Sequence, residues 1–251
     1  MRYHYIKYVK QDLFGALSLK GDMSSPTAWI GMAQELADFR AEIAWDDDVR
    51  VIILAGQEDH GFELELCCEP TAGDTEFRSV AHEIAEIEKP VIASIEGHAL
   101  GWGLELVLSS DLRIASDSSR FGFPQITLGS LPWEGGTQRL PRSISRAKAL
   151  EMILTGESID AAEACRIGLI NKRVPVQEVT PVTLALARDM ASKGPLALRY
   201  AKEAIHKGMD MTLVQGLRLE ADLYCLLQTT LDRTEGIQAY LQKKGPVFKG
   251  E

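Results

Sequence analysis

The sequence of 251 residues predicts an α/β core that is followed by a helical C-terminal region. Residues 51–54 are apolar at every position, which is typical of a strand in the middle of a sheet covered on both faces. A helical pattern at about 76–87 and a second buried strand at 90–95 follow, so the order is strand, helix, strand. After Val174 nearly all of the remaining pattern is helical.

The remaining elements are predicted from apolar spacing, turn residues and helix caps. Further strands are expected at 16–20, 113–115 and 120–122, and helices at 26–44, from 104, after 160, and at 179–190, 195–207, 213–227 and 234–243. Asp160 and Glu163 have the spacing of a capping box, and Gly168 is a helix stop. The change of pattern places a domain boundary near residue 190. Residues 1–190 then form the core with the site, and residues 191–251 the helical region.

Composition narrows the class of partner and the compartment. The net charge of −9 does not favour a nucleic-acid or anionic-membrane partner. No apolar run is long enough to span a bilayer, and the N-terminal residues lack the apolar segment of a signal peptide. The four cysteines and five histidines show no CxxC pair or metal-ligand spacing. We therefore expect a cytoplasmic protein with reduced thiols and no metal.

Several motifs in one order give the chain its clearest resemblance. They are IEKPVIASIEGHALGWGLELVLSSDLRIASDSSRFGFP, LGSLPWEGGTQRLPR, ALEMILTGESIDAAEACRIGLINKRV and RTEGIQAYLQKKGPVFKG. Together they resemble the crotonase (enoyl-CoA hydratase/isomerase) superfamily from about residue 49 onward. The resemblance implies a spiral of ββα units with C-terminal helices that form a homotrimer, or a hexamer of two trimers. It also implies an acyl-CoA thioester substrate and no cofactor other than the coenzyme A of that substrate.

Catalysis in this family stabilises an enolate whose negative charge gathers on the thioester oxygen. Two backbone N–H groups aimed at that oxygen form an oxyanion hole, and a helix N-terminus adds a favourable dipole. By resemblance the donors are the N–H groups of Leu66 and Trp102. Both surroundings depart from the family, because Trp102 and Glu65 stand where glycine is usual.

Hydration in this family usually employs two carboxylates, and this chain has only the first in place. Glu105 matches it, whereas Gln125, twenty residues on, stands at the position of the second. An amide can orient water but cannot act as an acid or base. Glu134 in the PWEGG turn is the candidate replacement, so our hypothesis is that Glu105 and Glu134 are the acid/base pair and that Gln125 orients water or substrate.

Each of these residues also has an ordinary structural interpretation. Glu105 could be a buried helical glutamate with a partner, and Glu134 a surface glutamate in a glycine-rich turn. Trp102 and Trp133 are either packing residues or groups that reshape the acyl pocket. We place Trp133, Gly101 and Cys67 in the substrate pocket, although Cys67 could equally be an inert apolar residue.

Two further positions carry weaker signals. His98 beside Gly97 is more typical of a hydrogen-bonded structural histidine than of a base. Lysines at the end of the last helix complement its dipole and are often only solvated. By resemblance, Lys244 and Phe248 contact the phosphate or adenine of coenzyme A, in some relatives across a subunit boundary.

The leading functional prediction is an enoyl-CoA hydratase-type lyase acting on an unusual acyl group. A double-bond isomerase is the nearest alternative, because one carboxylate can move a proton along an enolate. Decarboxylation and thioester hydrolysis need the same oxyanion hole and stay open, since a fold alone does not decide a reaction. A degenerate relative that binds acyl-CoA without turnover is the alternative from a different class.

Overall fold

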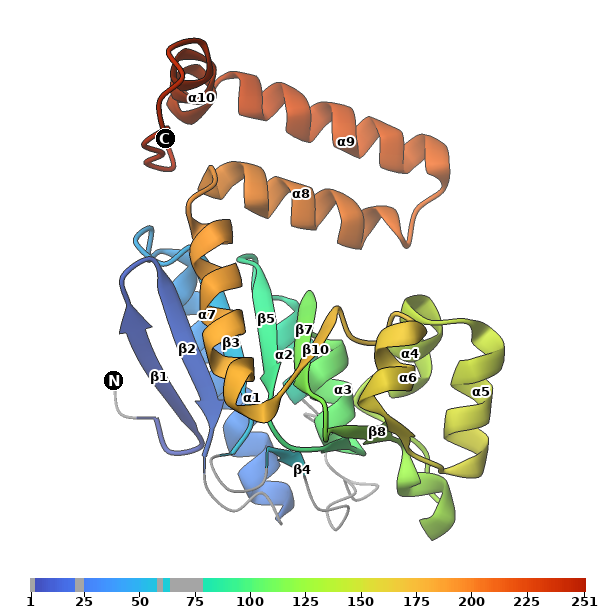
Figure 1. Ribbon diagram of the computed structural model, residues 1–251. Helices are drawn as coiled ribbons and strands as arrows, with labels where there is room; N and C mark the ends of the chain where they lie inside the picture. The colour runs from blue at the N-terminus through green and yellow to red at the C-terminus, as the bar shows by residue number, and fades with distance from the viewer. Residues whose placement is uncertain (1–2, 21–24, 58–60, 64–78) are drawn as a thin grey trace.

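The computed structural model describes residues 3–20, 25–57, 61–63 and 79–251 and confirms an α/β core followed by helices (Figure 1). Along the chain, strands alternate between a larger and a smaller sheet. After β3, β5 and β7 of the larger sheet, the chain adds β4, β6 and β8 to the smaller one. This alternation produces the predicted spiral, and it places one end of the larger sheet against the smaller sheet.

The larger sheet has the order β1-β2-β3-β5-β7-β10 among the described residues, and only the β1–β2 pair is antiparallel. Its strands are β1 (Ile6–Gln11), β2 (Phe14–Leu19), β3 (Val51–Ala55), β5 (Val91–Ile95), β7 (Leu112–Ser116) and β10 (Lys172–Val174). The smaller sheet has the order β4-β6-β8-β9 and is parallel except for β8–β9. Its strands are β4 (Phe62–Glu63), β6 (Ala99–Leu100), β8 (Arg120–Gly122) and β9 (Ile159–Asp160).

Helices cover the sheets and form the C-terminal region. They are α1 (Pro26–Ala44), α2 (Val80–Ala85), α3 (Trp102–Leu108), the 3₁₀ helix η1 (Pro124–Leu128), α4 (Gly136–Ser143), α5 (Arg146–Thr155), α6 (Ala161–Arg166), α7 (Val176–Ala191), α8 (Pro195–Gly208), α9 (Leu213–Gln228) and α10 (Leu231–Leu241). The prediction of a helix at 26–44 is confirmed. The sequence analysis did not predict α4 or α5. In α4, the cap Gly135, the first residue Gly136 and the internal Pro141 are all signals of a turn.

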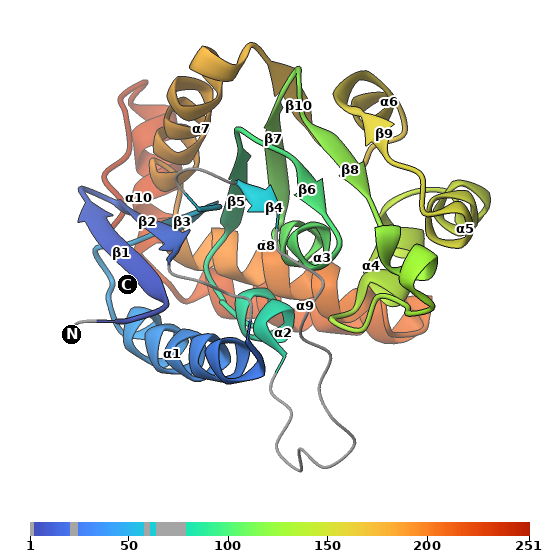
Figure 2. The ribbon, with the colours of Figure 1, turned by 90° about the horizontal axis from the view of Figure 1, so that it is seen from below.

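The larger sheet is buried on both faces, as the apolar strand at 51–54 predicts. Val51 and Ile53 of β3 pack in the cluster that includes α7, while Ile52 and Leu54 pack in the cluster that includes α1, α2 and α3. Seen from below, α7 lies on one side of the sheet and α1, α2 and α3 lie on the other (Figure 2). Each such side chain stabilises the fold by about 1.5–3 kcal/mol through its burial.

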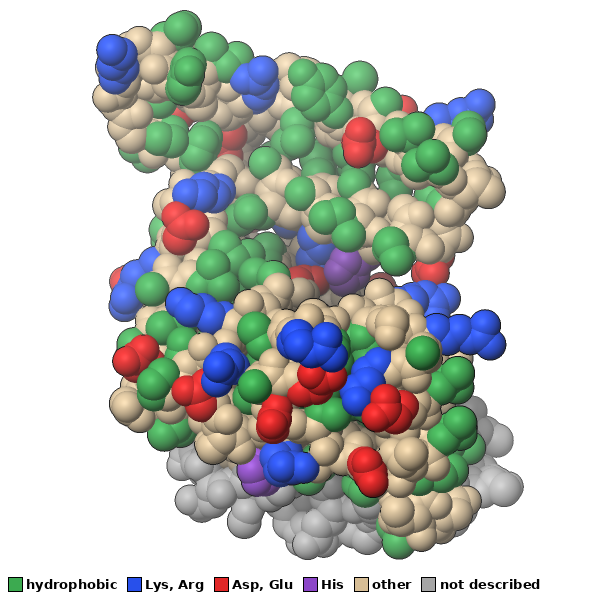
Figure 3. All heavy atoms as spheres, turned by 45° about the vertical axis from the view of Figure 1, so that its right-hand side comes forward, with side chains coloured by type: hydrophobic (Ala, Val, Ile, Leu, Met, Phe, Trp, Pro, Cys, Tyr) green, Lys and Arg blue, Asp and Glu red, His purple; other side chains and the backbone are tan. Residues whose placement is uncertain are grey.

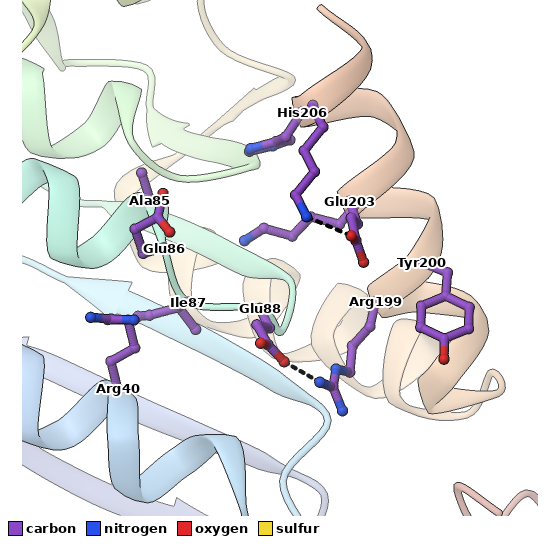
Figure 4. Close-up of a pocket in the computed structure, with 11 residues that line it drawn as sticks. Arg40, Ala85, Glu86, Ile87, Glu88, Arg199, Tyr200, Glu203 and His206 are labelled. Atoms are coloured by element: carbon purple, nitrogen blue, oxygen red, sulfur yellow. Dashed lines mark hydrogen bonds and ion pairs between the residues drawn. The ribbon is translucent and has the colours of Figure 1, made fainter. Parts of the chain in front are cut away.

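The C-terminal helices attach to the core through polar contacts. Helix α8 has no fully buried residue, and it meets the core across a cavity of about 290 Å³ (Figure 4). Charged groups pair across this junction, with Arg199 on Glu88 and with Lys202 Nζ 2.8 Å from an Asp111 carboxylate oxygen. The helices leave many apolar side chains exposed, visible as green spheres over the upper part of Figure 3.

Candidate active site

Glycines at the start of α3 allow β4 to pack closely against this helix. Gly101 has φ +56°, which strains a residue with a side chain. A Cβ at Gly103 would lie 1.6 Å from the carbonyl oxygen of Phe62 in β4, so only glycine permits this approach. Trp102 is the first residue of α3, and its N–H therefore has no acceptor within the helix. The prediction of an oxyanion donor at Trp102 depends on such an N–H.

Glu105 lies in the first turn of α3, and every residue of that helix is buried. Its side chain is 0% exposed. The Gly136 N–H donates a hydrogen bond of 2.7 Å to Oε1, and Oε2 has no hydrogen-bond partner among the described residues. A Cβ at Gly136 would lie 3.0 Å from Oε1 and 2.8 Å from Pro132 Cβ, so glycine is required for this contact. The arrangement leaves one carboxyl oxygen available for chemistry.

Burial raises the pKa of Glu105 to about 8. The hydrogen bond from Gly136 opposes this rise in pKa, and the neighbouring carboxyl of Glu134 adds to it. At neutral pH the group therefore carries a proton in the folded protein. A buried acid with this pKa suits general acid catalysis, which is most efficient when the pKa lies near the working pH.

Glu134 is also buried, with 2% of its surface exposed. The alternative interpretation of Glu134 as a surface glutamate in a glycine-rich turn is therefore wrong. Trp29 Nε1 donates to Oε1 at 2.8 Å, while Ser79 Oγ and the Ala81 N–H donate to Oε2 at 2.5 and 2.9 Å. Burial raises the pKa of Glu134, and these three hydrogen bonds oppose the rise. The structure thus places a second carboxyl near Glu105, but one whose two oxygens both accept hydrogen bonds from other groups.

Gln125 lies in η1 and is 2% exposed. Neither its Oε1 nor its Nε2 has a hydrogen-bond partner among the described residues. The ring of Phe123, the residue just before η1, packs against Gly136, where an added Cβ would lie only 2.9 Å from it. The start of η1 therefore lies next to the residue that donates to Glu105. A buried amide without partners costs about 1–3 kcal/mol, which is consistent with a group kept for substrate or water.

Three tryptophans pack together beside the glutamates. The ring centroids of Trp29 and Trp102 lie 4.8 Å apart, and those of Trp102 and Trp133 lie 5.7 Å apart in a T-shaped arrangement. Trp102 is almost fully buried and Trp133 is partly buried. Sequence reasoning identified Trp102 and Trp133 but missed Trp29 and Ser79, because their contact with Glu134 joins segments more than 50 residues apart.

The remaining predicted residues either lie outside the described part of the chain or lie far from Glu105 in the single chain. Leu66 and Cys67 lie outside the described residues. Lys244 is exposed and Phe248 packs near Gly236 of α10, in the C-terminal region at the opposite end of the molecule from the smaller sheet (Figure 1). His98 Nδ1 accepts a hydrogen bond of 3.2 Å from the Arg120 N–H, as a structural histidine does.

Two other features, a metal-binding cluster and a membrane-spanning helix, are absent from the described residues. Among them there is no group of three or more His, Cys, Asp or Glu side chains that could hold a metal ion. None of the helices in the described ranges is long and apolar enough to cross a membrane.

A spiral of two sheets with a buried acid at the start of a glycine-bounded helix is the arrangement that the resemblance to the crotonase class predicts. The sequence profile of the enoyl-CoA hydratase/isomerase family matches residues 29–251. The chain is 38% identical over 223 residues to a probable enoyl-CoA hydratase from Mycobacterium leprae, covering 86% of this chain and 87% of that one. It is 47% identical over 162 residues to 2,3-dehydroadipyl-CoA hydratase from Escherichia coli, covering 64% of each chain.

The solved structures agree with the sequence comparisons. An enoyl-CoA hydratase from Bacillus anthracis superposes with a TM-score of 0.88 at 35% identity, covering 99% of this chain and 100% of that one. The chain belongs to the enoyl-CoA hydratase/isomerase family of the crotonase superfamily, and it is an enzyme of that family.

The raised pKa of Glu105 predicts a pH-dependent gain in stability for Glu105→Gln. The folded protein keeps a proton that the unfolded chain releases between the ordinary pKa of 4.5 and about 8. Wild-type stability therefore falls as pH rises through this range, by up to about 1.4 kcal/mol per pH unit. Glutamine cannot ionise, so the Tm of Glu105→Gln minus the Tm of the wild type should increase as the pH rises from about 5 to about 8.

Thermal unfolding followed by circular dichroism at several pH values checks this expectation. Glu178→Gln is the matched control, because Glu178 is exposed on α7 and the chemical change is the same. A Tm difference between Glu105→Gln and the wild type that stays constant with pH would contradict a raised pKa at Glu105.

Proposed function

We propose that this enzyme is an enoyl-CoA hydratase-type lyase, adding water to an unsaturated acyl-CoA thioester or removing it. The single observation that carries the proposal is the Glu105 carboxyl, buried in an apolar helix with one oxygen held by Gly136 and the other unpartnered among the described residues. A buried acid without a full set of partners is costly to fold, and perturbed acids cluster at functional sites.

The chemistry can be written with one carboxyl group. Water attacks the β-carbon of the enoyl thioester, and the double-bond electrons move onto the thioester oxygen to form an enolate. Glu105 gives its proton to the α-carbon and receives the proton that the water loses, so the carboxyl is regenerated. Gln125 orients the water, because an amide can both donate to it and accept from it.

The enolate oxygen is stabilised by backbone donors in this proposal. Trp102 N–H, at the start of α3, is one donor, and Leu66 N–H is proposed as the other. Loss of one such donor costs about 3 kcal/mol in other enzymes, so this is a large contribution to rate. Gly101 and Gly103 support it by allowing the backbone at Trp102 to approach β4.

The acyl group is proposed to differ from a simple straight chain. Trp29, Trp102 and Trp133 fill the space beside the glutamates with rigid aromatic surface, which supports a reshaped pocket that also includes Gly101 and Cys67. The relative from Escherichia coli is named for a 2,3-unsaturated CoA ester. We therefore expect a double bond conjugated with the thioester in the substrate of this enzyme as well.

Double-bond isomerisation is the second candidate, and Gln125 is the observation that favours it. With an amide at this position, Glu105 is the acid best placed to move a proton, and isomerisation needs only one proton moved along an enolate. Decarboxylation and acyl-CoA binding without turnover would employ the same oxyanion donors and are distinguished by the product.

A homotrimer, or a hexamer of two trimers, is proposed for the assembly. Apolar side chains of the C-terminal helices support it, since Leu213 is 79% and Tyr240 84% exposed in the single chain. In such an assembly Lys244 and Phe248 would contact the coenzyme A of a neighbouring subunit.

A cytoplasmic location is also proposed. Cys165 and Cys225 are free thiols, which agrees with this location.

Incubation in deuterated water with 2-enoyl, 3-enoyl, dienoyl and cyclic CoA thioesters tests the reaction, with products read by mass spectrometry. A hydratase adds one water to at least one 2-enoyl member and labels the α-carbon. Glu105→Gln should lower kcat by about 10²–10⁴ because it removes the proton donor, while Glu178→Gln should match the wild type. Isomerised product without added water would favour the second candidate, and binding without turnover would overturn both.

Gln125→Leu should separate stability from activity. Leucine is close in size and removes two buried polar atoms that lack partners, so the Tm should rise by a few degrees, corresponding to about 1 kcal/mol. The same change should lower kcat, because nothing then orients the water. Unfolding curves and steady-state kinetics measure the two effects, and a variant that is both more stable and fully active would exclude a role for Gln125 in the reaction.

Native mass spectrometry should report a mass that is a multiple of three chains. Leu213→Asp should shift the population toward single chains, because a charge without a partner would be buried between subunits. Leu154→Asp is the control, as Leu154 is 65% exposed on α5, outside the C-terminal helices. A wild-type protein that stays a single chain at micromolar concentration would contradict the proposed assembly.

A further inference from the structure

The hydrogen bonds around Glu134 all point toward its oxygens. Trp29 Nε1 and the Ala81 N–H can only donate, and they do so at 2.8 and 2.9 Å. Ser79 Oγ accepts a hydrogen bond of 3.0 Å from the His82 N–H, so its own hydrogen is free to point at Glu134 Oε2, 2.5 Å away. Three donors on one carboxyl favour its ionised form and oppose the rise in the pKa of Glu134 that burial causes.

Glu105 has the opposite surroundings. Its one short hydrogen bond, from the Gly136 N–H, ends on Oε1, the Glu134 backbone N–H adds a weaker interaction, and Oε2 has no hydrogen-bond partner among the described residues. The rest of α3 is apolar and buried, which disfavours a charge at this position. Of the two neighbouring carboxyls, Glu105 is therefore the better place for a proton, and Glu134 the better place for the charge.

One backbone turn, residues 134–136, links the two glutamates, because it contains Glu134 and the N–H that donates to Glu105. Glu134 and the donor Gly136 are separated only by Gly135, which has φ +107°. The Glu134 side chain ties this turn to α1 through Trp29 and to the start of α2 through Ala81, while Arg139 donates to the Glu134 carbonyl oxygen at 2.7 Å. These contacts hold the Gly136 N–H where Glu105 accepts it.

The charged groups on the neighbouring helices α1, α2 and α4 are consistent with a single negative charge shared by Glu105 and Glu134. From α4, the Arg139 guanidinium faces both glutamates and Glu86. From α2, Glu83 is paired with Arg40 of α1 at 3.0 Å. Arg139 supplies one positive charge near the turn, so a second buried anion at Glu105 would have no cation of its own among these groups.

We propose that Glu134 is a positioning residue: it is the fixed anion of the Glu105–Glu134 pair, and it holds Glu105 in place as the member that carries the transferable proton. The pair thus divides its roles by environment, one carboxyl keeping the charge and the other the proton. This differs from the hypothesis of direct acid/base chemistry at Glu134, because both of its oxygens already accept hydrogen bonds. The inference rests on the proposed function only where activity is measured.

Infrared difference spectroscopy of the full-length protein tests the charge assignment without any substrate. The carbonyl band of the protonated Glu105 carboxyl, identified by its loss in Glu105→Gln, is followed as a function of pH. In the wild type its midpoint should lie near pH 8. In Glu134→Gln the midpoint should fall by about one pH unit or more, because the neighbouring negative charge is gone. An unchanged midpoint would overturn the proposal.

Trp29→Phe gives a second test if Glu134→Gln folds poorly. It keeps an aromatic ring against Trp102 but removes the N–H that supports the Glu134 anion, so the Glu105 midpoint should again fall, by less. Trp45→Phe is the matched control, because Trp45 is 87% exposed and the chemical change is the same. An equal shift in both variants would contradict the proposal.

Steady-state kinetics on a CoA thioester that the enzyme converts distinguish two roles of Glu134, positioning of Glu105 and direct proton transfer. If Glu134 positions Glu105, Glu134→Gln should move the pH profile of kcat to lower pH together with the infrared midpoint and retain turnover at the new optimum. If Glu134 transfers protons itself, kcat should fall by about 10²–10⁴ at every pH, which would overturn the proposal. An infrared shift in a protein that turns over none of the thioesters would reject the hydratase function and leave the charge assignment intact.

Discussion

The burial of the Glu105 carboxyl inside an otherwise apolar helix is the constraint on which the rest of the site depends. A polar group in such a position needs a partner, and Gly136 supplies one through its backbone N–H at 2.7 Å. That bond requires a glycine at 136, a turn of fixed shape before α4, and a second group that holds the turn in place. Glu134 holds it by accepting hydrogen bonds from α1 and α2. The site is thus assembled from four helices around one side chain.

The two-sheet spiral explains why these helices meet. After β3, β5 and β7 the chain continues from the larger sheet into the smaller sheet, so the helices that follow these passes, α2, α3 and α4, begin at the same end of the core. Gly103 lets β4 approach α3 within a distance that no side chain would allow. The backbone N–H at Trp102 and the carboxyl at Glu105 both belong to the first turn of α3, which suits the proposed stabilisation of an enolate and transfer of a proton at adjacent atoms.

The polar junction between the core and α8 has a different character from the site. Its charges pair with one another across a cavity, as Lys202 and His206 do with Asp111, and it buries little apolar surface. The apolar surface of the C-terminal helices faces outward instead. A single chain therefore leaves the helical region partly unsupported, which is the physical basis for proposing that neighbouring subunits complete it.

The sequence by itself determined the elements with strong periodicity and the first carboxyl of the site. The helix at 26–44, the doubly buried strand around Ile52 and Ile53, and Glu105 in an apolar helix could all be predicted, because local spacing and burial decide them. Strand β1 was not foreseen, since an edge strand with mostly exposed residues has little apolar pattern. Only the tertiary structure decided the surroundings of Glu134. Its donors Trp29 and Ser79 lie 105 and 55 residues away along the chain, and such contacts arise from packing, which no spacing rule describes.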